Sequence, residues 1–109
     1  MVNMLVETTA LETSFYGIRV NAVAPGVTNT TARMKNDSIG FTEGQNRTFL
    51  IESGKDVPLQ NKLNQPSEIA KTMLWLASSD ASFITGEILT VDGGTSLTSI
   101  DYPDYLKVL

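Results

Sequence analysis

Residues 16–31 read YGIRVNAVAPGVTNTT, and this stretch decides how the chain folds. Gly17 follows a helical pattern, at a point where a residue without a Cβ can adopt the left-handed conformation that ends a helix. Residues 18–24 are small or β-branched and carry a single charge, which is typical of a parallel strand covered on both faces. Pro25 cannot donate to a ladder, so we expect it to stop the strand, and Gly26 allows a sharp turn.

Residues 27–31 follow the carboxyl end of the predicted strand, which is where ligands bind in open α/β sheets. They offer free backbone groups and the hydroxyls of Thr28, Thr30 and Thr31. The simpler alternative is a strand end followed by a polar loop that binds nothing. The turn is thus a candidate binding edge that contains no catalytic group.

The segment before this stretch predicts an amphipathic helix over 1–16. Apolar residues recur at 2, 5, 6, 11 and 15, and Glu7 and Glu12 lie at other positions. No capping residue precedes the pattern, so we expect the chain to enter in the middle of a helix and a preceding segment to be missing.

Residues 25–57 are interpreted as a binding turn followed by a substrate lid. The lid is polar, contains Gly40, Gly44 and Gly54, and has one short apolar run at 49–51. A loop of this length after a binding turn favours a flap over a ligand. The alternative is a floppy insertion with one short surface helix.

A second helix is predicted over 66–79 and a second strand over 87–91. Pro66 suits the first helical position, and an apolar stripe follows it at helical spacing. Trp75 lies off this stripe, as surface cover or as a subunit contact. Strand, lid, helix and strand form a βαβ unit, so we expect two parallel and adjacent strands. The apolar tail over 95–109 is expected to pack on another surface.

Composition excludes several kinds of site. The 109 residues include eight basic and twelve acidic residues, for a net charge of -4, and the basic residues are scattered, so we expect no nucleic-acid partner. Cysteine and histidine are absent, so we expect no metal site. Glu7 and Glu12 interrupt the apolar start, so we expect no membrane span and a cytoplasmic protein.

Several segments together resemble the C-terminal part of a short-chain dehydrogenase/reductase. They are LVETTALE, YGIRVNAVAPG, Pro58-Leu59 and QPSEIAKTMLWLASSDASFITGEILTVDGG, in the order and spacing of that family. The resemblance implies an α/β fold, the C-terminal portion of a doubly wound parallel-sheet (Rossmann) fold, in the order helix, strand, lid, helix, strand. It also implies one partial Rossmann-type domain over 1–109.

The resemblance implies a cofactor site on the turn. Pro25 and Gly26 match the family's Pro-Gly turn, and the main chain of Val27 and Thr28 is expected to meet the nicotinamide carboxamide of NAD or NADP. The hydroxyl of Thr30 is expected to bind the carboxamide or diphosphate side. The family's glycine-rich turn and its Tyr-x-x-x-Lys pair have no counterpart in the 109 residues, so no catalytic residue is assigned.

Two functions remain open. The chain is interpreted as the nicotinamide edge, lid and oligomer interface of an oxidoreductase that acts on a small alcohol or carbonyl substrate. The alternative is a non-catalytic truncated product that at most associates with full-length relatives. A homo-oligomer is expected in the first case, because the family forms dimers or tetramers.

Overall fold

A computed structural model describes residues 1–30 and 43–99. The chain divides into two compact units, Met1–Pro25 with Gln65–Val91 and Gly26–Asn64 with Asp92–Leu109.

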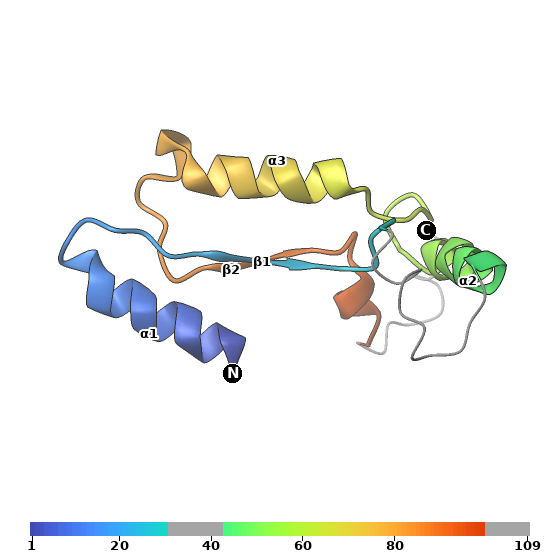
Figure 1. Cartoon of the computed structure of the whole chain (residues 1–109), viewed down its shortest axis with the longest axis horizontal. Coiled ribbons are helices and arrows are strands. Elements are labelled where there is room, and N and C mark those ends of the chain that lie inside the picture. The colour runs from blue at the N-terminus through green and yellow to red at the C-terminus, as the bar shows by residue number, and fades with distance from the viewer. Residues whose placement is uncertain (31–42, 100–109) are drawn as a thin grey trace. The chain divides into compact units, whose positions relative to one another are not determined.

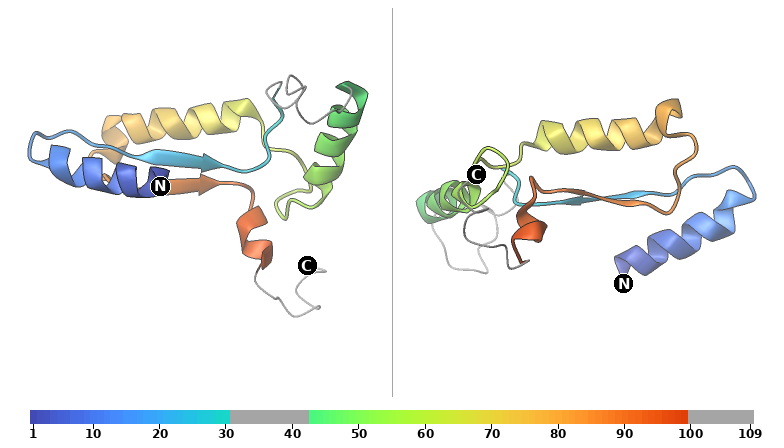
Figure 2. Two further views of the ribbon diagram at one scale, coloured as in Figure 1. Left: turned by 60° about the horizontal axis from the view of Figure 1, so that its bottom comes forward. Right: turned by 180° about the vertical axis from the view of Figure 1, so that it is seen from behind.

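The first unit is a pair of parallel strands between two helices. Its elements are α1 (Val2–Ser14), β1 (Ala22–Pro25), α3 (Pro66–Ala77), the 3-10 helix η2 (Ser79–Ala81) and β2 (Ile88–Val91). β1 pairs with β2 in parallel, with Ala22 opposite Ile88 and Pro25 opposite Val91. Figure 1 and the right panel of Figure 2 show α3 over one face of the strands and α1 over the other. The predicted α/β class with adjacent parallel strands is confirmed.

The conformation of Gly17 and the hydrogen bonds around it explain where α1 ends. Gly17 has φ +71° and donates its N–H to Ser14 O, while Ile18 donates to Thr13 O, which is the Schellman arrangement that closes a helix. The helix is therefore two residues shorter at its end than the predicted range 1–16.

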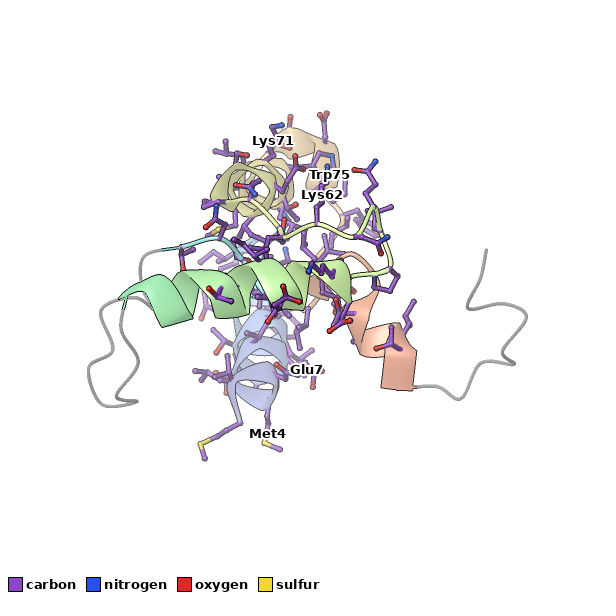
Figure 3. The ribbon with its side chains drawn as sticks, turned by 90° about the vertical axis from the view of Figure 1, so that its right-hand side faces the viewer. Met4, Glu7, Lys62, Lys71 and Trp75 are labelled. Atoms are coloured by element: carbon purple, nitrogen blue, oxygen red, sulfur yellow. The ribbon has the colours of Figure 1, made fainter. Side chains whose placement is uncertain are left out.

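The buried side of α1 differs from the predicted apolar side. Ala10 is buried against the rest of the unit, whereas Met4, Leu11 and Phe15 are exposed. These three share one face at positions i, i+7 and i+11. In Figure 3 the labelled Met4 points away from the strands.

The strand β1 is shorter than the predicted range 18–24 and includes Pro25, which was expected to stop it. Ala22 N–H donates to Glu87 O at 2.8 Å, so Ala22 directs its backbone groups toward β2. Successive residues of a strand direct these groups to opposite edges, so Val23 and Pro25 direct theirs to the other edge. Pro25 is tolerated because the N–H that it lacks would not pair with β2.

Arg19 joins β1 to the end of α3. Its Nη1 donates to Leu76 O at 2.7 Å and to Ile84 O at 3.3 Å, and its Nη2 donates to Ser78 O at 3.1 Å. Asn21 extends the pairing, because it donates to Ile84 O and accepts the N–H of Glu87. The polar residues of the strand segment thus fix α3 and the chain that leads into β2.

The apolar stripe of α3 is only partly buried. Leu76 is buried, and Leu74, which the sequence places in the stripe, is 71% exposed. Trp75 is 45% exposed, and Figure 3 shows it with Lys71 on α3. The helix ends at Ala77 and η2 follows, so the predicted end at 79 is two residues late.

The second unit contains a helix that the sequence analysis did not assign. α2 (Glu43–Lys55) occupies the second half of the predicted lid, and the 3-10 helix η3 (Thr95–Ser99) begins the predicted tail. Leu50 and Val57 are buried in this unit. The predicted lid therefore includes thirteen helical residues. The alternative interpretation, an insertion with one short surface helix, allowed for a helix here but for a shorter one. Thr31, the first part of the lid and residues 100–109 of the tail lie outside the described residues.

Candidate functional site

The predicted turn begins with a glycine that has no room for a side chain. A Cβ on Gly26 would lie 2.6 Å from the Cβ and 2.8 Å from the Cα of Asp92. Contacts this short do not occur between real carbon atoms, so the turn can lie against Asp92 only with glycine at this position. Gly26 therefore allows the sharp turn and also the close contact with Asp92.

Asn64 pairs with the backbone of the turn. Asn64 N–H donates to Val27 O at 3.2 Å, and Asn29 N–H donates to Asn64 O at 2.9 Å, which makes a parallel bridge between Thr28 and Asn64. The expectation that the whole turn offers free backbone groups is therefore wrong for Val27 O and Asn29 N–H. Both groups are already paired because a second chain segment runs beside the turn.

The backbone N–H and C=O of Thr28 lie on the side of the turn that faces away from Asn64. Since Val27 and Asn29 direct theirs to Asn64, the N–H and C=O of Thr28 point away from it. Within residues 1–30 and 43–99 the structure gives these two groups no hydrogen-bond partner. The Thr28 hydroxyl donates to Gly26 O at 2.9 Å and so closes the turn. Val27 and Thr30 are half-buried, as is Thr28.

Asp92 organises the turn that follows β2. Its Oδ1 accepts the N–H of Gly94 and its Oδ2 accepts the N–H of Ser96, both at 2.9 Å. Hydrogen bonds from the side chain and backbone of Ser96, and then from Gly94, hold the pKa of Asp92 below its usual value. This carboxylate therefore serves the fold as an anion that caps η3.

The first unit contains an open cavity of about 400 Å³ between β1 and α3. None of the predicted site residues lines it. Its lining residues are Arg19, Asn21, Val23, Met73, Leu76 and Ala77.

Residues 1–30 and 43–99 contain no group of three acidic side chains placed to hold a metal ion. Among the same residues no helix is both long and apolar enough to cross a membrane.

The parallel strands, the helices on both faces and the turn after β1 define a partial Rossmann-type α/β protein. A family model described as Enoyl-(Acyl carrier protein) reductase matches residues 1–96. The chain belongs to the short-chain dehydrogenase/reductase family of oxidoreductases. Members of this family generally use NAD or NADP, act on small alcohol or carbonyl substrates and often form oligomers.

Individual relatives match almost the whole chain. Glucose 1-dehydrogenase 2 of Bacillus subtilis (strain 168) is 37% identical over 106 residues, which cover 97% of this chain and 36% of that relative. 3beta-hydroxysteroid dehydrogenase 1 of Eggerthella lenta is 38% identical over 104 residues, which cover 95% and 35%. A crystal structure of a short chain dehydrogenase family protein from Francisella tularensis superposes with a TM-score of 0.70 and 30% identity, over 88% of this chain and 40% of that one.

The chain thus spans about a third of the length of these curated relatives. The structure gathers Gly26, Val27 and Thr28 with Asn64 and Asp92, two residues that were not predicted to belong to the site. Asn64 acts through its backbone, and such an interaction cannot be inferred from the residue type. The Asp-Gly-Gly sequence at 92–94 did signal a turn, but not that the turn contacts Gly26.

Proposed function

We propose that the chain forms the nicotinamide edge and substrate lid of an NAD(P)-dependent oxidoreductase that acts on an alcohol or carbonyl substrate. The observation that carries this proposal is the backbone of Thr28: its N–H and C=O have no partner within residues 1–30 and 43–99, and Asn64 occupies the opposite side of the turn. An amide N–H and a C=O side by side suit a carboxamide, which has one acceptor oxygen and an NH₂ donor.

The chain's own residues hold and orient the cofactor in this proposal. Pro25 ends β1 and directs the chain into the turn, and Gly26 brings the turn against Asp92. Thr28 presents its main-chain N–H and C=O to the nicotinamide carboxamide, while Val27 holds the turn in place through its pairing with Asn64. The Thr30 hydroxyl binds the carboxamide or diphosphate side. The bound dinucleotide supplies the hydride donor or acceptor. α2 belongs to the segment that closes over the substrate.

Catalytic tyrosine and lysine residues belong, in this proposal, to polypeptide outside the 109 residues. None of the three tyrosines in the sequence is followed by lysine four positions later. We further propose a cytoplasmic location and a homo-oligomer that uses the exposed faces of α1 and α3.

A chimera tests the proposal. Residues 1–96 replace the matching segment of the Bacillus subtilis glucose 1-dehydrogenase 2, and dinucleotide binding is measured by fluorescence titration. We expect binding to persist and Thr30→Val to raise the dissociation constant up to about tenfold, the worth of one hydrogen bond. Thr72→Val in α3 is the matched control and leaves the constant unchanged. A folded chimera that binds no dinucleotide contradicts the proposal.

The exposed apolar side chains of α1 favour a second candidate, a non-catalytic chain that at most associates with full-length relatives. Met4, Leu11 and Phe15 are each at least 70% exposed. Dinucleotide binding by the purified 109-residue chain supports the first candidate, because the second candidate predicts none.

A further inference from the structure

The segment between α2 and α3 does more than connect them. Val57 N–H donates to Gly54 O at the end of α2, and Asn61 N–H donates to Val57 O. Gln60 and Asn61 have φ of +63° and +47°, a left-handed pair that reverses the chain direction. The reversal brings Leu63 and Asn64 back along the turn that follows β1.

The same segment is fixed to the turn after β2. Leu59 N–H donates to Gly93 O at 3.0 Å. A Cβ on Gly93 would lie 2.6 Å from Cγ1 of the buried Val57, so the two turns are packed without a gap. The segment 57–64 therefore contacts the end of α2, the turn at 92–94 and the turn at 26–30.

The pairing of Asn64 has a directional consequence for Thr28. An isolated loop could rotate its peptide groups freely, but here Val27 O and Asn29 N–H are both held by one residue. The two peptide planes that flank Thr28 are therefore fixed, and with them the direction of its N–H and C=O.

We propose that Asn64 is a positioning residue: its backbone orients the N–H and C=O of Thr28 for the nicotinamide carboxamide and ties the cofactor turn to the end of α2. This inference rests on the proposed function. It assigns the orientation to a backbone pair rather than to any side chain. It also makes the cofactor turn and the end of the lid helix parts of one hydrogen-bonded cluster, so that ordering one stabilises the other.

Two substitutions at Asn64 in the 109-residue chain separate backbone from side chain. Asn64→Ala removes the side chain and keeps the N–H that donates to Val27 O. Asn64→Pro removes the same side chain and also the N–H. Amide hydrogen exchange at Asn29 and NADH-induced changes in the amide resonances of Val27 and Thr28 are measured by NMR for both variants and the unmodified chain.

We expect Asn64→Ala to behave as the unmodified chain does. In Asn64→Pro, we expect the Asn29 amide to exchange about five- to tenfold faster and the NADH affinity reported at Thr28 to fall about five- to tenfold, the effect of one lost hydrogen bond. Unchanged exchange and NADH response in Asn64→Pro overturn the inference. Equal losses in both variants also overturn it, because the side chain would then be responsible.

Two further outcomes are informative. If the unmodified chain shows no NADH response at 27–30, the NADH measurement is made in the chimera with residues 1–96, where a lack of binding contradicts the proposed function. Asn29 exchange in the 109-residue chain still decides whether Asn64 orders the turn. If Asn64→Pro unfolds the chain, an ester in place of the Leu63–Asn64 peptide bond, made by semisynthesis, removes the same N–H without a proline ring. An ester variant with protected Asn29 counts against the inference, and one with fast exchange supports it.

Discussion

Gly26 lies so close to Asp92 that no side chain fits at this position. In Gly26→Ala the new Cβ meets both Cα and Cβ of Asp92, so the backbone must move. We expect the free energy of unfolding to fall by about 1–3 kcal/mol, as for an overpacked site, measured by urea denaturation. Gly44→Ala is the control, because a Cβ there meets nothing within 4 Å. Equal midpoints for the two variants would contradict the close contact.

Asp92 predicts a pH dependence. Its folded pKa lies below the unfolded value of about 3.9, so the unfolded chain binds more protons and the stabilisation is present above that value. The stabilisation is lost as the pH falls through about 3.9 toward the folded pKa. We expect Asp92→Asn to be less stable than the unmodified chain at pH 7 and the difference to be smaller at pH 3, below the unfolded pKa. Urea denaturation at both pH values measures it, and a difference independent of pH argues against the ionic role.

For single residues, the sequence predicts the roles that depend on the side chain or on its absence. Gly17 was predicted to end a helix, and its positive φ confirms this. Asn64 could not be predicted, because its N–H and C=O are common to every residue except proline. Whether Pro25, Gly26, Val27, Thr28 and Thr30 bind a cofactor stays a prediction.

At the scale of elements, β1 has two different edges. Ala22 N–H donates to Glu87 O, whereas Val23 directs its N–H away from β2. We expect Ala22→Pro to lower the free energy of unfolding by about 1–3 kcal/mol more than Val23→Pro, because Glu87 O loses its donor. Thermal and urea unfolding followed by circular dichroism measure this. Equal losses would show that the pairing does not stabilise the strand.

α2 shows why one element was missed. Its sequence, EGQNRTFLIESGK, has a glycine near each end and a single apolar run, so it lacks the repeated apolar face on which helix prediction depends. Among the side chains of this helix that the structure describes, Leu50 is buried and anchors it. α3 was predictable because Pro66 and a longer apolar stripe mark it.

At the scale of the molecule, the outer face of α1 predicts self-association. Met4, Leu11 and Phe15 form an exposed apolar row. We expect the purified chain to associate with rising concentration in sedimentation velocity. Leu11→Glu weakens the association, because a charge in a buried contact is costly. Asn3→Glu adds the same charge at an exposed polar position and is the control. Identical sedimentation of the two variants would rule out this row as the contact.

The parallel pairing of the two strands could be predicted from the apolar periodicity and the turn residues, because two strands joined through a helix have few possible topologies. The strand ends were less predictable. Pro25 belongs to β1 because the N–H that proline lacks would point away from β2 at this position. That 1–109 is one partial domain stays a prediction.

Arg19 also bears on the order in which the chain acquires its structure. The last turn of α3 has no basic residue of its own, and Arg19, 57 residues away in the sequence, supplies the positive charge at its carbonyls. The carboxyl end of α3 is therefore completed only when β1 docks. Contacts of such long sequence separation slow folding, so the nascent segment 66–77 remains frayed at that end until the two distant parts of the chain meet.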